Sequence, residues 1–371
     1  MRLGLIFHRF APRGGLEKYL LEFAAQLRAA GHTLHLVTAE IDPEIESQLD
    51  ATVHRIDLGQ VPSVLRERAF ARAAAPLAHQ LPVDATIGFG RTTTHDLHRA
   101  SGGCHKVYSR ILSSRKRWSP KNLIALQLEK QLYQSGGTKL FVVNAIEPGR
   151  QIQREYGVEP ERIRVIHTAV DIERYRPAED RAALKGEILS ETGSDSTRPV
   201  FLFVSLDHRR KGLKVLLDIW SDVPADLWVA GKPFDARQRR VISQRNLESK
   251  IRNFAPTVDV SQLFRAADWF IHPTLYDACA NTVLQSMASG LPGLISSRDG
   301  AVELIRDGEN GFVLARPDDP AQVLAVVRRA LNTDQPTREF LATAARNTML
   351  PLTWKAHLEK WMTAIQEVRR R

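Results

Sequence analysis

The stretch of sequence that decides the fold is residues 1–37, MRLGLIFHRFAPRGGLEKYLLEFAAQLRAAGHTLHLV. The apolar run Leu3–Phe7 is typical of a short buried strand. Apolar residues then recur at helical spacing over Leu16–Leu27, and Gly31 follows as the residue that ends the predicted helix. A second apolar run, Leu34–Val37, predicts another strand. Strand, helix and strand in this order indicate a parallel βαβ unit, the building block of doubly wound sheets.

A second series of this kind begins near Pro199, after a polar stretch, Glu179–Arg198, that predicts a surface excursion. The predicted strands are Val200–Val204, Leu227–Ala230, Trp269–His272, Gly293–Ser296 and Phe312–Leu314, and the predicted helices are Leu213–Trp220, Val260–Ala267, Asn281–Ser289 and Pro320–Leu331. We therefore predict an α/β protein with two Rossmann-like, doubly wound domains, residues 1–170 and 171–350. Ligands of such sheets bind beyond the carboxyl ends of the strands, so the two domains are expected to face each other across a cleft.

The amino-acid composition limits the classes of protein to which the chain can belong. The chain has 371 residues, 43% of them hydrophobic and 25% charged, which is typical of a globular protein with ample core. No run of eighteen apolar residues predicts a membrane-spanning helix, and the N-terminus lacks the pattern of a secretory signal. Two cysteines far apart in the chain, Cys104 and Cys279, predict neither a disulfide framework nor a zinc site, so a cytoplasmic location is expected.

The formal net charge of +10 indicates an anionic partner or a generally basic surface. Between Asp96 and Glu129 the sequence has no acidic residue, and aromatic and aliphatic residues alternate with cations there. The basic patch of this segment comprises Arg110, Arg115, Lys116, Arg117, Trp118 and Lys121. This mixture predicts contact with anionic lipid headgroups, at about 1 kcal/mol for each cation near the surface. A solvated basic loop is the alternative.

Three loops are predicted to bind the anionic part of a ligand. The first holds Gly14 and Gly15 between a strand and a helix, where backbone amides and the helix dipole favour an anion, and a simple tight turn is the alternative. No dinucleotide-binding or P-loop glycine pattern occurs in the sequence. The second loop holds Arg210 and Lys211 before Gly212, and its cations can neutralise a diphosphate unless it is a solvated basic turn.

The third loop opens the predicted helix at Asn281, whose free amides make it a second anion site. The residues expected to line it are Cys279, Ala280, Asn281 and Thr282. Gln285, inside the same helix, either hydrogen-bonds ribose hydroxyls or is an ordinary surface residue. The sequence has no Asp-x-Asp triplet to hold a divalent ion on a diphosphate, so no metal is expected and cations with helix N-termini take over that role.

Together these motifs resemble the retaining glycosyltransferases of the GT-B fold, of the glycosyltransferase family 4 type. The resemblance extends over nearly the whole chain and rests on Gly14–Glu17, Val165–Asp171, Tyr175–Pro177, Arg210–Gly212, Ala266–Pro273, Asn281–Pro292 and Asp307–Phe312. Within the family, the chain is similar to the branch that adds the first glucose to the inner-core heptose of lipopolysaccharide. In this fold the C-terminal segment, here residues 351–371 with a helix predicted over Trp354–Val368, crosses back to the first domain.

The resemblance implies a function. A hexose, with UDP-glucose as the expected donor, is transferred with retention to a lipopolysaccharide-core or other cell-envelope saccharide; the first domain binds the acceptor and the second binds the nucleotide sugar. Arg210 and Lys211 then stabilise the diphosphate leaving group, Asp277 touches the donor sugar and Gln285 touches the ribose. No cofactor besides the donor is implied. A lipid-linked acceptor would place the protein on the inner face of the cytoplasmic membrane.

The chain departs from the family pattern at three places, one of which is Thr168–Ala169, where the family usually has Asn-Gly. The family usually has Glu at both positions that Asp277 and Gln285 occupy here. Gly102–Gly103 stands where the related enzymes have an Asp suspected to act as base, which leaves Asp96 or His105 to take the proton of the acceptor hydroxyl. For His105, a surface histidine is the alternative.

Rival functions stay open at this point. A hydrolysing sugar-nucleotide epimerase of similar fold needs a pair of carboxylates in the cleft, and the sequence offers no clear second one. A non-catalytic relative that binds membranes or nucleic acid is suggested by the uncharged Gln285. Nucleic-acid binding lacks support, because no recognised nucleic-acid motif occurs and the basic residues cluster with apolar ones.

Overall fold

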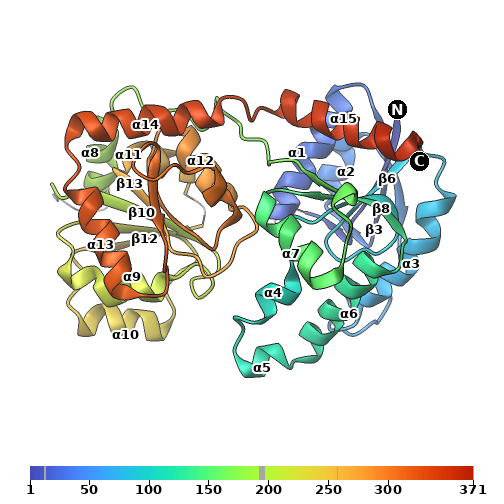
Figure 1. Cartoon of the computed structure of the whole chain (residues 1–371), viewed down its shortest axis with the longest axis horizontal. Coiled ribbons are helices and arrows are strands. Elements are labelled where there is room, and N and C mark those ends of the chain that lie inside the picture. The colour runs from blue at the N-terminus through green and yellow to red at the C-terminus, as the bar shows by residue number, and fades with distance from the viewer. Residues whose placement is uncertain (12–13, 192–196, 257, 371) are drawn as a thin grey trace. The chain divides into compact units, whose positions relative to one another are not determined.

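The computed structural model describes residues 1–11, 14–191, 197–256 and 258–370. The chain divides into two compact units (Figure 1). Unit 1 comprises Met1–Thr168 together with Trp354–Arg371, and unit 2 comprises Ala169–Thr353. Each unit is built around one large parallel sheet with helices packed against it, which confirms the predicted α/β fold of two Rossmann-like domains.

Within the described residues, the sheet of unit 1 has seven parallel strands in the order β5-β3-β1-β6-β7-β8-β9. They are β1 Arg2–Ile6, β3 Thr33–Thr38, β5 Thr52–Arg55, β6 Ala85–Phe89, β7 His95–Arg99, β8 Thr138–Val143 and β9 Ile163–Val165, with β2 Arg9–Phe10 and β4 Glu40–Ile41 as a separate pair. The helices are α1 Gly15–Ala29, α2 Pro43–Leu49, α3 Arg66–Gln80, α4 His105–Ser109, α5 Ser114–Arg117, α6 Pro120–Gln134, α7 Ile146–Tyr156 and α15 Trp354–Arg370. The pairing of β1 with β3 confirms the βαβ unit predicted from the first 37 residues.

The core of unit 1 joins the first helix of the chain to the last. The apolar face of α1, with Phe23 at its centre, is buried against the sheet. The apolar stripe of α15 lies in the same cluster, and Trp361 and Ile365 are fully buried there. Figure 1 shows red α15 beside blue α1. Each such side chain contributes about 1.5–3 kcal/mol by its burial, so unit 1 depends on residues that follow unit 2 in the sequence.

Among the described residues, unit 2 has a six-stranded parallel sheet in the order β12-β11-β10-β13-β14-β15. Its strands are β10 Val200–Ser205, β11 Asp226–Gly231, β12 Ile251–Phe254, β13 Trp269–His272, β14 Gly293–Ser296 and β15 Gly311–Leu314. Its helices are α8 Arg181–Glu191, α9 Leu213–Ile219, α10 Ala236–Gln244, α11 Val260–Ala266, α12 Asn281–Ala288, α13 Pro320–Leu331 and α14 Gln335–Met349.

The surface excursion predicted for Glu179–Arg198 is wrong over most of its described part. Arg181–Glu191 forms helix α8, which packs against α11 and buries Leu189. Only a few apolar residues of this stretch recur at helical spacing. The many charged residues between them make the helix difficult to recognise from the sequence. Residues 192–196 of this stretch lie outside the described part of the chain.

The loops that follow three strands of unit 2 are fastened to one another by backbone hydrogen bonds. The amide of Leu275, after β13, donates to the carbonyl of Arg210, after β10, at 2.8 Å. The amide of Asp277 donates to the carbonyl of Arg298, after β14, at 3.1 Å. The carboxyl ends of these strands therefore carry a connected framework on which side chains are held. In the described part of the chain, no helix is both long and apolar enough to cross a bilayer.

Candidate active site

The loop after β10 brings two cations of unit 2 to one carboxylate. Arg210 Nη1 and Lys211 Nζ both donate to Asp277 Oδ2, at 2.8 Å and 2.5 Å. The loop closes at Gly212, which has a φ of +84°, and a Cβ there would lie 2.1 Å from the carbonyl oxygen of Pro273. Only glycine fits this position, and it allows Lys211 and Asp277 to meet.

The charge state of Asp277 follows from its surroundings. Burial alone would raise the pKa of its carboxyl group, but the positive charges of Lys211 and Arg210 outweigh burial and lower the pKa below its usual value. The carboxylate is therefore ionised at neutral pH. Without a ligand, the two cations of the loop already have an anionic partner.

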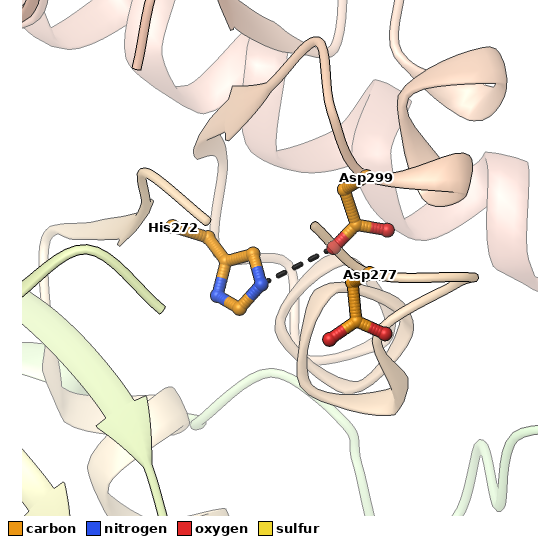
Figure 2. A group of neighbouring side chains, drawn as sticks. All are labelled: His272, Asp277 and Asp299. Carbon is orange, nitrogen blue, oxygen red and sulfur yellow. Dashed lines mark ion pairs between the residues drawn. The ribbon is translucent and has the colours of Figure 1, made fainter. Parts of the chain in front are cut away.

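Two residues that the sequence analysis missed complete this group. Figure 2 shows His272 and Asp299 beside Asp277. His272 Nε2 lies 3.2 Å from Lys211 Nζ and 3.2 Å from Asp299 Oδ2, and both His272 and Asp299 are buried. Burial and then the charge of Lys211 lower the pKa of His272, so the imidazole is neutral at neutral pH. His272 ends β13 and Asp299 lies shortly after β14, so the rule that ligands bind at strand ends is the signal that could have found them.

His272, Asp277 and Asp299 offer three ligand atoms within 4.8 Å of one another, an arrangement able to hold a metal ion. The ammonium group of Lys211 contacts two of the three side chains, Asp277 and His272. A cation of the protein itself is therefore already paired with two of the three groups, and a divalent ion would have to compete with it for them.

The N-terminus of α12 lies next to this group. Asp299 Oδ1 accepts a hydrogen bond from the amide of Ala280, the residue before α12, at 3.1 Å. Ala280, the N-cap residue, has no side-chain oxygen that could accept from the first amides of the helix. Within the described residues, the buried Thr282 Oγ1 has no hydrogen-bond partner. Uncapped amides, the helix dipole and this hydroxyl make the end of α12 suitable for an oxyanion.

The other residues predicted for this loop take different places. Cys279 and Ala280 are buried, at 4% exposure each, so they contribute backbone to the loop. Asn281 is the first residue of α12, and Gln285 lies farther along the same helix with a partly buried side chain. The structure thus brings the predicted third loop together with Arg210 and Lys211, as a continuous set within unit 2.

Unit 1 has a pocket of about 340 Å³ of its own. Its polar lining includes His8, Glu17, Glu67, Arg91, His98 and His105, with Gly102 and Gly103 at the loop after β7. Arg91 Nη1 donates to Glu67 Oε2 at 2.6 Å. We call this cavity the unit 1 pocket. Paired charges and imidazoles of this kind can hydrogen-bond the hydroxyl groups of a saccharide.

His105 is held from two sides in the unit 1 pocket. Its Nε2 lies 2.8 Å from Asn122 Oδ1, and its Nδ1 lies 3.5 Å from Arg91 Nη2. Burial and then the charge of Arg91 lower the pKa of His105. The ring is therefore neutral at neutral pH and able to accept a proton. The sequence does not predict the contributions of Glu67, Arg91 and Asn122, because only the fold brings these residues to His105.

Asp96 does not line the unit 1 pocket. It is the second residue of β7, away from the carboxyl end of that strand. Its Oδ2 accepts hydrogen bonds from the amide and hydroxyl of Thr86 at 2.9 and 3.0 Å, and its Oδ1 pairs with Lys139 at 2.9 Å. Of the two residues predicted to take the acceptor proton, the fold brings only His105 to this cavity.

Gly14 is the N-cap residue of α1 in unit 1 and Gly15 is its first residue, directly after residues 12–13, which lie outside the described chain. A Cβ on Gly14 would lie 2.6 Å from Glu17 Oε2, so a carboxylate already faces this helix N-terminus. Glu17 also lines the unit 1 pocket. Anion binding by the two glycines therefore stays a prediction, and any anion there would meet the charge of Glu17.

The basic patch lies on α5 and its flanks. All six of its members are exposed, and Trp118 is 68% exposed. Arg110 is paired with Glu155, whereas Arg115, Lys116 and Arg117 extend as consecutive cations along α5. Leu123, in α6, adds a further exposed apolar side chain at 46%. The patch thus combines an unusual exposed indole with cations on one short segment.

Two protein-family models match this chain. The model described as Glycosyltransferase Family 4 matches residues 13–174, and the model described as Glycosyl transferases group 1 matches residues 198–333. Together with the two parallel-sheet units, these matches define the chain as a glycosyltransferase of the GT-B fold. The predicted enzyme class, a glycosyltransferase, and the predicted fold are confirmed.

The particular relatives extend over the whole length of the chain. The lipopolysaccharide glucosyltransferase WaaG of Escherichia coli K12 is 24% identical over 365 residues, covering 94% of each chain. A crystal structure of WaaG, a glycosyltransferase involved in lipopolysaccharide biosynthesis, has a TM-score of 0.80 at 21% identity and covers 98% of each chain. The structure of Anabaena Alr3699/HepE in complex with UDP and glucose has a TM-score of 0.75 at 16% identity, covering 99% of this chain and 100% of that one.

Proposed function

We propose that this enzyme transfers glucose from UDP-glucose to a saccharide acceptor of the lipopolysaccharide-core type, with retention at the transferred carbon and without a metal ion. The observation that carries the proposal is the group of Arg210, Lys211 and Asp277 beside the uncapped N-terminus of α12. The similarity to a lipopolysaccharide glucosyltransferase supports the transferred sugar and the acceptor class. The related structure in complex with UDP and glucose supports the donor.

The donor diphosphate is proposed to bind on unit 2, to the amides of α12, the hydroxyl of Thr282 and the cations of Arg210 and Lys211. Negative charge on the diphosphate grows as the bond to the sugar breaks, so preorganised cations stabilise the transition state more than the ground state. Lys211 is already held in place by Asp277 and His272, and this supports a mechanism without a divalent ion. Gln285 is proposed to bind the ribose.

The acceptor is proposed to bind in the unit 1 pocket. The oxygen of an acceptor hydroxyl forms the new bond to the anomeric carbon, and the bond from that carbon to the diphosphate oxygen breaks. The hydroxyl proton goes to Nδ1 of His105, whose lowered pKa keeps the imidazole unprotonated near neutral pH. Arg91 and Glu67 are proposed to orient the neighbouring hydroxyl groups of the acceptor.

The basic patch is proposed to rest on an anionic membrane surface, the inner face of the cytoplasmic membrane, where a lipid-linked acceptor would be presented. Its consecutive cations and the exposed Trp118 support this placement. The indole suits the headgroup region, because its apolar body and its polar N–H find suitable partners there.

Calorimetry with UDP, UDP-glucose, GDP-mannose and ADP-glucose, in the presence of a chelator, tests the donor site. We expect binding of UDP-glucose, and at least a hundredfold weaker binding by the Arg210→Ala/Lys211→Ala variant, because two charge-assisted contacts of about 1.5–3 kcal/mol each are lost. The matched control is Arg237→Ala/Arg239→Ala, which removes two exposed cations from α10 of the same unit.

Transfer is then measured with radiolabelled UDP-glucose and lipopolysaccharide that lacks its outer sugars. Retention is read from the anomeric configuration of the product. Binding that requires added magnesium, an epimerised donor without transfer, or equal losses in both double variants would each contradict the proposed mechanism.

A further inference from the structure

We propose that Asn122 is a positioning residue that fixes the imidazole of His105 in a single tautomer, with the proton on Nε2 and with Nδ1 left as the hydrogen-bond acceptor on the side of Arg91 and the unit 1 pocket. Its meaning for catalysis rests on the proposed function. The tautomer itself follows from hydrogen bonds inside unit 1 and does not depend on that function.

The first step is the orientation of the Asn122 amide. Asn122 lies in the first turn of α6 and is 5% exposed. Its Nδ2 donates to the backbone carbonyl of Arg117, a member of the basic patch, at 2.8 Å. A carbonyl oxygen can only accept, so the amide nitrogen must face Arg117 and the amide oxygen must face His105. If the amide were flipped, the side-chain oxygen of Asn122 would face the carbonyl oxygen of Arg117, and neither atom can donate a hydrogen bond.

The second step is the tautomer of His105, which follows from the orientation of the Asn122 amide. Asn122 Oδ1 lies 2.8 Å from His105 Nε2 and can only accept, so Nε2 must carry a proton. In a neutral ring the other nitrogen, Nδ1, is then the acceptor. The neighbour of Nδ1 is Arg91 Nη2, at 3.5 Å, and a guanidinium can only donate. The partners on both sides of the ring therefore require the same tautomer.

The backbone and the surroundings of His105 are fixed as well. The carboxylate of Glu129 accepts hydrogen bonds from the amides of His105 and Lys106, the first two residues of α4. Arg91 is itself held by Glu67. The ring of Tyr108 lies 5.6 Å from the imidazole, centroid to centroid. With backbone and ring both held, two contacts favour a proton on Nε2, and that of Asn122, at 2.8 Å, is stronger than that of Arg91, at 3.5 Å.

This arrangement makes Asn122 necessary for the proposed proton transfer without placing it against the substrate. If the proton moved to Nδ1, that nitrogen would have no lone pair left with which to take the proton of an acceptor hydroxyl. Loss of Asn122 is therefore expected to lower kcat and to leave the KM for the donor unchanged.

Nitrogen-detected NMR of protein labelled at its histidine rings tests the tautomer directly, and His105→Gln identifies the resonances of His105. In the unsubstituted protein we expect a protonated Nε2 and an unprotonated Nδ1. In Asn122→Ala we expect a mixture of tautomers and a kcat about tenfold lower, a part of the 10²–10⁴ that a positioned base contributes. The matched control is Gln127→Ala, which removes an exposed amide from the same helix. It should change neither the tautomer of His105 nor kcat.

Asn122→Asp separates positioning from a merely structural role. A carboxylate there still accepts from Nε2 and keeps the tautomer, but it also favours a second proton on Nδ1. The charged groups already around His105 are Arg91, Glu67, Glu129 and Lys106. We expect Asn122→Asp to recover kcat at high pH and to move the acid limb of the pH–rate profile to higher pH.

The proposal is overturned if Asn122→Ala keeps the tautomer of the unsubstituted protein, or if it loses that tautomer with kcat unchanged. Should Asn122→Ala fail to fold, an unshifted acid limb in Asn122→Asp overturns it. A protein without any transferase activity contradicts the proposed function, and the NMR comparison still decides whether Asn122 fixes the tautomer.

Discussion

A single carboxylate oxygen, Oδ2 of Asp277, accepts hydrogen bonds from both cations of the proposed donor site. The family usually has the longer Glu at this position. Asp277 is partly buried and ionised, so its charge opposes any diphosphate that approaches Arg210 and Lys211. The residue that holds the cations in place therefore also weakens their attraction for the leaving group.

Replacement of Asp277 by Asn is expected to strengthen the binding of UDP by about tenfold, because removal of one nearby charge is worth about 1.4 kcal/mol or more at the dielectric of a partly buried site. It should also lower the Tm, since two cations lose their anionic partner. Calorimetry with UDP and thermal unfolding measure the two effects. Asp218→Asn, which removes a carboxylate that pairs with Lys214 and Arg245, is the control and should leave UDP binding unchanged. Weaker UDP binding in Asp277→Asn would show instead that the carboxylate itself holds the nucleotide.

At the scale of elements, the loop after β10 depends on one glycine. The positive φ of Gly212 and the carbonyl of Pro273 leave no room for a side chain. Gly212→Ala should therefore cost at least about 1–2 kcal/mol of stability through the left-handed backbone alone. It should weaken UDP binding by more than tenfold, because the loop must move away from Pro273.

Gly186→Ala is the matched control for this glycine. Gly186 lies inside α8, and a Cβ there would have no neighbour within 4 Å. The same chemical change should here stabilise the protein by about 0.5–1 kcal/mol and leave UDP binding unchanged. Urea unfolding and calorimetry compare the two variants, and equal effects at the two positions would contradict the assigned role of Gly212.

The sequence predicts the elements of the site better than the contacts between them. The start of α12 and the loop that holds Arg210 are visible as local patterns, since a strand end followed by helical spacing needs only neighbouring residues. His272, Asp299 and Asn122 were missed because their roles arise from pairs far apart in the chain. His105 is predicted from the sequence, but no local pattern favours it over Asp96, since which end of β7 faces a cavity depends on the sheet.

At the scale of the whole molecule, the two units should differ in their response to changes in α15. Trp361 is fully buried in the core of unit 1. Trp361→Ala should therefore destabilise unit 1 by about 3–5 kcal/mol. The core of unit 2 contains no part of α15 among its described members, so its unfolding should be unaffected. Urea unfolding followed by hydrogen exchange measures each unit separately.

The control for this change is Trp118→Ala, which removes the same side chain from a position that is 68% exposed. Its effect on stability should stay within about 0.5 kcal/mol. A uniform loss of protection in both units of Trp361→Ala would show that the units unfold together, contrary to this prediction.

The whole chain is strongly basic, so any loss of cations could weaken its binding to an anionic membrane. A variant of the basic patch must therefore be compared with a variant of the same net charge that is substituted elsewhere. Arg115→Ser/Lys116→Ser/Arg117→Ser should weaken binding to anionic lipid vesicles by roughly 100-fold, since each cation contributes about 1 kcal/mol. Arg237→Ser/Arg239→Ser/Arg240→Ser removes three exposed cations from α10 and should leave vesicle binding nearly unchanged. Sedimentation with vesicles measures both, and similar losses would indicate a diffuse effect of the +10 net charge.

The return of α15 to unit 1 also has a consequence for synthesis on the ribosome. The 185 residues of Ala169–Thr353 separate the two segments of unit 1, and translation of that stretch takes about 10–40 s at 5–20 residues per second. During this time the nascent sheet of unit 1 lacks Trp361 and its neighbours, and its apolar face is open to chaperones. The later unit, which is continuous in sequence, can therefore complete its core before the earlier one.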